Sequence, residues 1–525
     1  MKAPRFPNLV AMLEASCRAY PDYPLLGTRQ ADGWHWIKFR EFEELVGRCR
    51  AGLVGLGVKP GDRVAVISNN RVEWAIAAHA AYSLGAVYVP MYDAQLDKDW
   101  AYILCDSGAV VCFAASEAIR ARVERLRPHC PRVREIITFD GGPDERDTFA
   151  ALLARGTDTI VQASASDVGS DDLACIIYTS GTTGNPKGVE LTHGNLASNV
   201  SAILEMTPLG ARERSLAFLP WAHVYGGCLE LHTVMAMGGS IAVCEDPQKL
   251  AQYMPEVQPT LLFAVPRIWN RMYDGIMKAL AKKPRAVREL FARGMRLASK
   301  QKRGEQLGLR ERVWLALARR VIFKPIVARF GGQLRFAFSG AASLSYDVAE
   351  FIDNLGIEVY EGYGMTECAG MITSNRPEAR RIGSVGKPAS SVTVKLVPAA
   401  GASQPGEGEI VVYGPGLMAG YHGLPSETHD TLTPDGGLRT GDLGRFDQDG
   451  FLYITGRVKE LFKLSNGKYV APVPIEERLQ LSPYIAQCVV FGDGQPHVVA
   501  LIVVDAEALL EWAGAQGLPG TLHEV

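Results

Sequence analysis

The chain has 525 residues, of which 47% are hydrophobic and 21% are charged, and its formal net charge is −2. This length predicts three or four domain-sized units with ample hydrophobic core, and the near-zero charge excludes a global field for nucleic acid, so we expect no nucleic-acid partner. The ten cysteines show no C-x-x-C pair and no zinc-like histidine spacing, which indicates a reducing, cytoplasmic setting.

Helical and extended patterns alternate along the first part of the chain. An amphipathic helix at 40–57 begins a series that we predict to continue as strand 63–67, helix 73–83, strand 86–89, helix 100–106 and strand 110–113. The start of the chain contains no long apolar segment, so we expect neither a signal peptide nor a transmembrane helix. This alternation is typical of a doubly wound α/β layer.

The alternation resumes in the middle of the chain, with predicted strands at 173–177, 215–219, 239–244, 260–266, 334–342 and 358–364. A helical, charge-rich insertion covers 269–328. Its Lys and Arg residues cluster between Lys282 and Arg320, a pattern that favours a solvated helix face, with peripheral membrane contact as the alternative.

The sequence pattern changes after Gly383. Short alternating strands at 392–396, 409–413 and 451–455 predict a β-rich subdomain. A final α+β piece begins near Arg457, with a predicted helix at 475–481 and strands at 488–491 and 498–504. We therefore expect a large domain at 1–456 and a smaller C-terminal domain at 457–525, and the resemblance described below implies that the smaller domain is incomplete.

Hydroxyl groups, glycines and a lysine gather directly after the predicted buried strand 173–177. A helix beginning at Leu196 and capped by Asn195 is expected further on. Glycines let backbone N–H groups surround phosphate oxygens, hydroxyls add donors, and lysine adds positive charge. Because Lys187 follows Pro186 and precedes Gly188, this is not a Walker A motif. The sequence predicts a polyphosphate-binding loop of Thr179, Ser180, Gly181, Thr182, Thr183, Gly184 and Lys187.

Two further motifs favour a nucleotide site. The segment Tyr360-Glu-Gly-Tyr-Gly-Met-Thr-Glu367 places Tyr363 and Thr366 at the carboxyl end of a predicted strand, where open α/β sheets bind ligands. In Thr440-Gly-Asp442 the carboxylate can accept hydrogen bonds from both hydroxyls of a ribose.

The loop Tyr-Thr-Ser-Gly-Thr-Thr-Gly-x-Pro-Lys-Gly resembles the signature of the AMP-forming adenylating enzymes, which include acyl-CoA synthetases, luciferases and peptide-synthetase adenylation domains. Gly-Tyr-Gly-x-Thr-Glu and Thr-Gly-Asp resemble two other motifs of that family. The resemblance covers about Ala19 to Asp505. It implies ATP, Mg²⁺ and CoA as ligands, in an α/β fold with a mobile C-terminal domain.

The resemblance also implies roles for individual residues. Glu367 would bind Mg²⁺ together with Thr179, which agrees with the preference of this ion for hard oxygen ligands. Tyr363 would stack on adenine and Thr366 would contact the α-phosphate. The catalytic residues implied are Lys187, His223, Thr366, Glu367 and the hinge residue Lys459. Beyond the loop, the nucleotide-binding residues implied are Gly340, Ala341, Glu361, Gly362, Tyr363, Gly364, Thr366, Asp442, Arg457 and Lys463.

Segments 67–74, 383–388 and 461–472 resemble the long-chain fatty acyl branch of the family. The implied reaction is the conversion of a fatty acid, ATP and CoA to acyl-CoA, AMP and pyrophosphate through an acyl-adenylate. One alternative is an acyl-AMP ligase that loads a carrier protein.

Another alternative is a fragment that binds nucleotide or acyl-adenylate with little turnover. Members of the family carry a late lysine that contacts the carboxylate and the α-phosphate, and no lysine follows Lys468 in this sequence. The sequence leaves open the acyl chain length, a homodimer and a peripheral membrane location.

Overall fold

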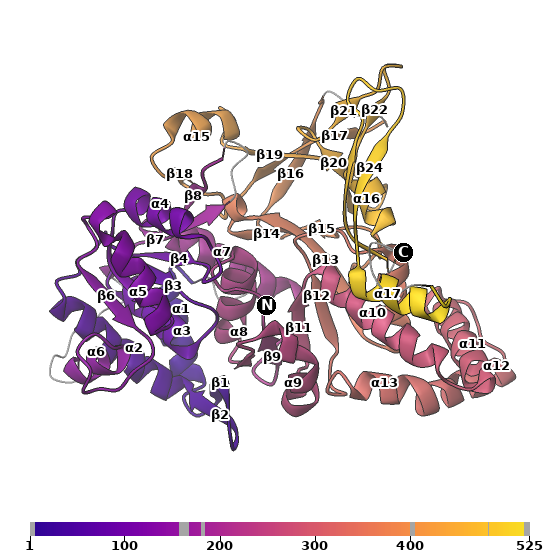
Figure 1. Ribbon diagram of the computed structural model, residues 1–525, viewed down its shortest axis with the longest axis horizontal. Coiled ribbons are helices and arrows are strands. Elements are labelled where there is room, and N and C mark those ends of the chain that lie inside the picture. The colour runs from indigo at the N-terminus through magenta and orange to yellow at the C-terminus, as the bar shows by residue number, and fades with distance from the viewer. Residues whose placement is uncertain are drawn as a thin grey trace.

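The computed structural model describes residues 6–156, 167–179, 184–399, 405–480, 482 and 484–518. Two large sheets, with helices between and outside them, form the bulk of the molecule (Figure 1). A four-stranded sheet and most of the C-terminal elements lie above them in this view. The predicted α/β fold class is confirmed. No helix among the described residues has both the length and the apolar character needed to cross a bilayer.

The first large sheet has the strand order β18-β8-β7-β4-β3-β5-β6. The five strands β7, β4, β3, β5 and β6 run parallel to one another. Strands β8 and β18 extend the sheet beyond β7 and pair in antiparallel fashion. The central strands are buried on both faces, as expected for parallel strands rich in Val, Ile and Ala. The strands are β3 (Arg63–Ile67), β4 (Val87–Met91), β5 (Ala109–Ala114), β6 (Glu135–Thr138), β7 (Leu173–Thr179), β8 (Lys187–Thr192) and β18 (Gly420–Tyr421).

The second large sheet has the order β15-β14-β13-β12-β11-β9-β10-β1-β2 and is parallel from β13 to β1. Its edges are antiparallel. The strands are β1 (Pro24–Gln30), β2 (Gly33–Lys38), β9 (Arg214–Ala217), β10 (Ser240–Val243), β11 (Leu261–Ala264), β12 (Phe336–Ser339), β13 (Glu358–Met365), β14 (Gly370–Ser374) and β15 (Lys387–Pro388).

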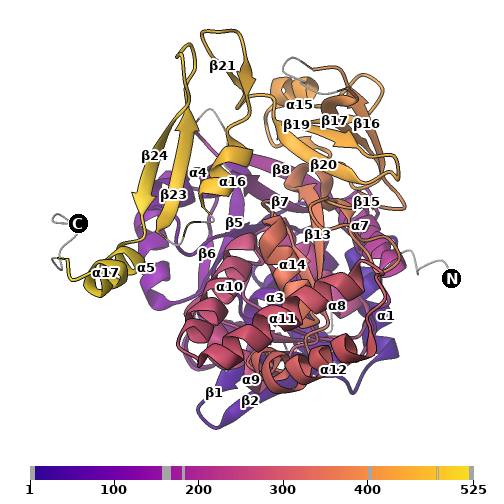
Figure 2. The same cartoon turned by 90° about the vertical axis from the view of Figure 1, so that its right-hand side faces the viewer.

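Helices cover both sheets. Helices α1, α3, α7 and α8 pack together between the sheets, whereas α10 to α13 form an outer layer on the right of Figure 1 that faces the viewer in Figure 2. The helices are α1 (Leu9–Ala19), α2 (Phe39–Gly55), α3 (Val72–Ser83), α4 (Asp97–Ser107), α5 (Glu117–Leu126), α6 (Phe149–Arg155), α7 (His193–Met206), α8 (Thr233–Ala236), α9 (Leu250–Val257), α10 (Pro266–Ala281), α11 (Arg285–Lys302), α12 (Leu309–Ala318), α13 (Lys324–Ala328) and α14 (Tyr346–Leu355). The shorter helical turns are η1 (Arg127–His129), η3 (Tyr225–His232), η4 (Pro247–Lys249), η5 (Arg319–Phe323) and η6 (Thr366–Cys368).

The predicted β-rich region forms an antiparallel sheet of order β16-β17-β19-β20, flanked by α15 (Pro425–Thr431). In the C-terminal part, Nζ of Lys278 on α10 is 3.2 Å from Oε2 of Glu511 on α17. The elements are β16 (Thr393–Val397), β17 (Glu407–Tyr413), β19 (Leu438–Phe446), β20 (Leu452–Arg457), β21 (Phe462–Lys463), β22 (Tyr469–Val470), α16 (Val473–Leu479), β23 (Ile485–Phe491), β24 (Val499–Val504) and α17 (Ala506–Ala515).

The region after Thr179 differs from the prediction in two ways. Thr179 pairs with Lys187 across an antiparallel ladder, so the predicted phosphate-binding loop lies between two strands rather than between a strand and a helix. The helix begins at His193 and its N-cap is Thr192, not Asn195. Asn195 instead accepts the N–H of Thr192 while its own N–H bonds to the Thr192 hydroxyl, at 2.9 and 3.1 Å. Thr192 and Asn195 together form a capping box. Because both residue types are common N-caps, the sequence alone does not show which of the two precedes the helix.

Candidate active site

A cavity of about 350 Å³ lies at the carboxyl ends of β12 and β13, beside η3. This is the position at which open α/β sheets bind ligands. The structure brings together there side chains and backbone from motifs far apart in the sequence. The predicted site residues that line the cavity are Thr179, His223, Gly340, Ala341, Gly362, Tyr363, Gly364, Thr366, Glu367 and Arg457.

Asp442 holds two of these cavity residues. Its Oδ2 accepts the Tyr363 hydroxyl at 2.6 Å, and its Oδ1 accepts Nε of Arg457 at 2.8 Å. Asp442 and Arg457 are direct partners across β19 and β20. Burial, and then the adjacent carboxylate of Asp442, holds the pKa of Tyr363 well above its ordinary value, so this phenol remains a donor. A carboxylate has about four acceptor positions, so these two bonds leave capacity for ligand hydroxyls.

Glu367 forms a second polar centre together with Tyr421. The Tyr421 hydroxyl donates to Glu367 Oε1 at 2.8 Å, and Nζ of Lys187 lies 5.2 Å from the centroid of the Tyr421 ring. Burial and the nearby Glu367 raise the pKa of Tyr421. Tyr421 was not predicted as a site residue. It reaches the site because the two-residue strand β18 pairs with β8, and its only local signal is its place between Gly420 and Gly423.

The residues of this second centre can accommodate Mg²⁺. Glu367 Oε2 accepts no hydrogen bond among the described residues, and Thr179 lines the same cavity. One carboxylate and one hydroxyl suit an ion that keeps several waters and binds phosphate oxygens. The described part of the chain holds no cluster of three or more His, Cys, Asp or Glu side chains able to bind a metal.

His223 is positioned by hydrogen bonds to the segment before it and to Tyr225 after it. Asn70 donates to the Leu219 carbonyl and accepts the N–H of Trp221, both at 2.8 Å. Nδ1 of His223 accepts the N–H of Tyr225 at 3.1 Å, so the proton of the neutral ring resides on Nε2. Burial lowers the pKa of His223 and favours this neutral form.

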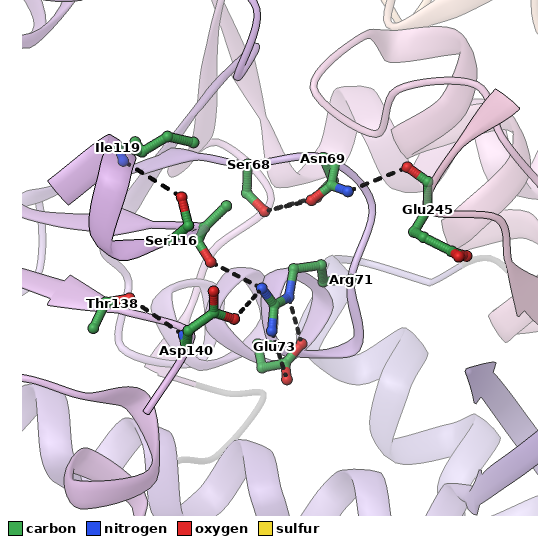
Figure 3. A network of polar contacts seen from close by, with 10 residues as sticks. Ser68, Asn69, Arg71, Glu73, Ser116, Ile119, Thr138, Asp140 and Glu245 are labelled. Atoms are coloured by element: carbon green, nitrogen blue, oxygen red, sulfur yellow. Dashed lines mark hydrogen bonds and ion pairs between the residues drawn. The ribbon is translucent and has the colours of Figure 1, made fainter. Parts of the chain in front are cut away.

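The turn that carries Asn70 is itself fixed by a polar network (Figure 3). Nη1 of Arg71 donates to the Ala115 carbonyl at 2.8 Å and to Asp140 Oδ1 at 2.7 Å. Asn69 donates to the Glu245 carbonyl, at 3.3 Å, beyond the end of β10 in the other sheet. The network therefore ties the carboxyl ends of strands in both sheets beside the segment that presents His223.

Small residues bring the backbone close to the cavity. Ala341 has φ of +68°, an uncommon conformation for a residue with a Cβ. A Cβ at Gly364 would lie 1.6 Å from the Gly370 carbonyl oxygen, so only glycine permits the approach of β13 to β14 at this site.

Several predicted site residues lie elsewhere. The Glu361 carboxylate, expected at the nucleotide, accepts the N–H groups of Leu344 and Gly383 at 3.1 and 3.4 Å, and Glu361 is not among the residues that line the cavity. Lys459 and Lys463 are exposed and outside the cavity, and Nζ of Lys463 lies 5.4 Å from the Tyr469 ring centroid. Gly184, with φ of +105°, is also outside its lining. The predictions for Ser180, Gly181, Thr182 and Thr183 lie outside the described residues.

Comparison with known proteins places the chain in a family. The profile of the AMP-binding enzyme family matches residues 13–422, and that of the AMP-binding enzyme C-terminal domain matches residues 459–513. The long-chain-fatty-acid–CoA ligase FadD15 of Mycobacterium bovis is 34% identical over 516 residues, which cover 96% of this chain and 83% of that protein. Long-chain-fatty-acid–CoA ligase 1 of Cavia porcellus is 32% identical over 529 residues, covering 96% and 74% respectively.

A solved structure of an ATP-bound protein has a similar fold. ATP-bound MatB from Rhodopseudomonas palustris superposes with a TM-score of 0.74 and 27% identity, covering 97% of this chain and 92% of that one. The chain therefore belongs to the AMP-binding enzyme family and is an ATP-using, AMP-forming ligase of the acyl-CoA synthetase type.

Proposed function

We propose that the protein is a long-chain fatty acid–CoA ligase. The observation that carries this proposal is that one cavity combines several polar residues of the nucleotide motifs, among them Thr366, Glu367 and Arg457, with an apolar lining. Phe263 and Phe338 stack in this lining with ring centroids 4.8 Å apart. The other apolar side chains include Ile203, Met206, Leu229 and Met371. Relatives that are named long-chain ligases, at 34% and 32% identity, support the same substrate class.

In the proposed first step, a fatty carboxylate attacks the α-phosphate of ATP and pyrophosphate leaves. Asp442 and Arg457 hold the ribose, the Tyr363 ring packs on adenine, and the Thr366 hydroxyl binds the α-phosphate. Lys187 and the phosphate loop neutralise the leaving pyrophosphate, which is the main requirement of a phosphoryl-type transition state. Glu367 and Thr179 would hold Mg²⁺, which supplies positive charge at the phosphates.

His223 is neutral in this proposal and donates from Nε2 to the carboxylate, which positions the nucleophile without a change of charge. In the second step the CoA thiol attacks the acyl carbonyl and AMP leaves. Lys459 and Lys463 stand outside the cavity. We propose that residues 457–525 form a mobile domain that turns at Lys459 and brings Lys463 to the second step.

The test is ATP–pyrophosphate exchange with carboxylates of graded length, followed by measurement of the thioester product. Exchange that rises with chain length and yields acyl-CoA supports the proposal. Preferential exchange with short or aromatic acids contradicts the long-chain assignment. Transfer to a carrier-protein thiol and not to CoA identifies an acyl-AMP ligase, and ATP binding without exchange identifies a low-turnover binding protein.

A further inference from the structure

The outer helical layer carries a strong local positive charge. Residues 282–329 contain fifteen Lys and Arg and three Glu, whereas the whole chain has a net charge of −2. Each of the three glutamates is already paired with one cation, namely Glu289 with Arg285 at 2.7 Å, Glu305 with Arg303 at 3.0 Å and Glu311 with Lys300 at 3.1 Å. Most of the positive charge in this layer is therefore not compensated within it.

An apolar stripe runs along α12 into η5 in the same layer. Leu309, Val313, Leu317 and Val321 recur every four residues and are 80%, 62%, 41% and 53% exposed. Residues four apart lie on one side of a helix, so these side chains form a continuous strip. Trp314 borders the strip with 39% exposure, and the guanidinium of Arg293 lies 4.5 Å from its ring centroid. The opposite side of the helix is buried through Leu315, Ala318 and Ile322.

A groove of about 750 Å³ lies on the same layer and is lined by four cations, Arg312, Arg319, Arg320 and Lys324. No Asp or Glu lines this groove. None of the four cations forms an ion pair within the part of the chain that the structure describes. An apolar strip beside an unpaired cationic groove has the composition of helices that lie in a membrane interface.

We propose that this strip and groove bind the surface of an anionic lipid bilayer. The strip would enter the boundary between headgroups and acyl chains, and the groove would receive anionic headgroups. A polyanion such as nucleic acid would account for the groove but not for exposed leucine, valine and tryptophan side chains. The layer lies at the outer edge of the molecule in Figure 1 and faces the viewer in Figure 2, so a flat surface can approach it.

The experiment is sedimentation of the full chain with vesicles of phosphatidylcholine alone and of phosphatidylcholine with phosphatidylglycerol. The stripe variant is Leu309→Ser with Val313→Ser and Leu317→Ser. The groove variant is Arg319→Gln with Arg320→Gln and Lys324→Gln. We expect the wild type to bind anionic vesicles at least about tenfold more tightly than neutral ones, and each variant to lose at least about tenfold, because charge and apolar insertion both contribute.

Two matched controls test whether this surface is specific. Leu501→Ser with Val503→Ser removes exposed apolar side chains from β24, and Arg125→Gln with Arg132→Gln and Arg146→Gln removes exposed cations elsewhere. Both controls should sediment like the wild type, and all variants should keep its melting temperature and ATP affinity. Equal binding to neutral vesicles, undiminished binding by the stripe and groove variants, or an equal loss in the controls would overturn the proposal. Self-association that depends on this face, without vesicle binding, would also overturn it and assign the face to a second copy.

Discussion

The cavity and a cluster of histidines in the helical core both include buried ionisable side chains, but those at the cavity have polar partners and the histidines have almost none in the described part of the chain. At the cavity, Asp442 accepts hydrogen bonds from the lining residues Tyr363 and Arg457. In the core His79, His193 and His232 meet between α3, α7 and η3. Both nitrogens of His193 and of His232, and Nε2 of His79, have no hydrogen-bond partner among the described residues.

The three histidines behave as aromatic core residues. The rings of His79 and His232 meet edge to face at 5.5 Å, and Tyr82 packs edge-on against His193 at 5.6 Å. Burial lowers the pKa of His193 to about 4 and that of His232 to about 3, so both are neutral at ordinary pH. Perturbed pKa values therefore occur both at the cavity and in the histidine cluster. The cavity differs from the cluster in having charged partners for its polar groups and an open volume beside them.

The largest expected effect is that of Glu367→Gln. The amide is nearly isosteric but a poor ligand for Mg²⁺, so the fold should persist and the rate should fall about 10²–10³-fold, the range for losing one electrostatic stabiliser of a transition state. Steady-state turnover at limiting Mg²⁺ measures this. Glu427→Gln, on α15 and outside the cavity, is the matched control. Near-normal turnover of Glu367→Gln would remove this residue from the metal site.

Asp442→Ala should have the next largest effect. It should weaken ATP binding by about 1.5–3 kcal/mol, the range for a hydrogen bond to a charged group. Calorimetric titration with ATP measures the affinity, and thermal unfolding separates this loss from misfolding. Asp430→Ala, at an exposed position of α15, should bind ATP like the wild type. An unchanged affinity would mean that Asp442 only holds Tyr363 and Arg457 in place.

The third prediction concerns the pH dependence of stability that buried His232 should cause. The folded-state pKa of His232, about 3, lies below its ordinary value of 6.5, so the unfolded chain binds more protons between these values. The free energy of unfolding should therefore be unaffected by His232 above pH 6.5 and fall below it, by about 2 kcal/mol at pH 5.

The measurement is the melting temperature between pH 7 and pH 5 for the wild type and for His232→Leu. The variant has no such group to protonate and should lose less stability in acid. His429→Leu, at an exposed position, is the control and should keep the wild-type slope. Equal slopes for the wild type and His232→Leu would show that His232 is accessible to protons in the folded state.

The smallest expected effect is that of Tyr421→Phe. It removes the hydrogen bond to Glu367 and leaves the ring beside Lys187, so the activation free energy should rise by about 0.5–1.5 kcal/mol and the rate should fall roughly two- to thirteenfold. Tyr413→Phe removes a similar 2.9 Å bond to Asp435 at the surface and should leave the rate unchanged. The same loss in both variants would show that Tyr421 acts through general stability and not through Glu367.

The sequence by itself determined most of the strands and the place of the nucleotide motifs. Strand β3 was predicted with its observed bounds, and β16 and β17 to within a few residues, because buried strands carry local apolar patterns bounded by turn residues. The motifs could be located for the same reason, since the glycines, hydroxyls and charges expected to contact one ligand group lie close together along the chain.

Only the tertiary structure decided which motifs meet and how their side chains pair. Tyr421 reaches Glu367 through the pairing of β18 with β8, and Arg457 reaches Asp442 through the register of β19 with β20. The Glu361 side chain turns to backbone N–H groups, although its neighbours line the cavity. These contacts depend on strand register and on long-range packing, which a local pattern does not specify.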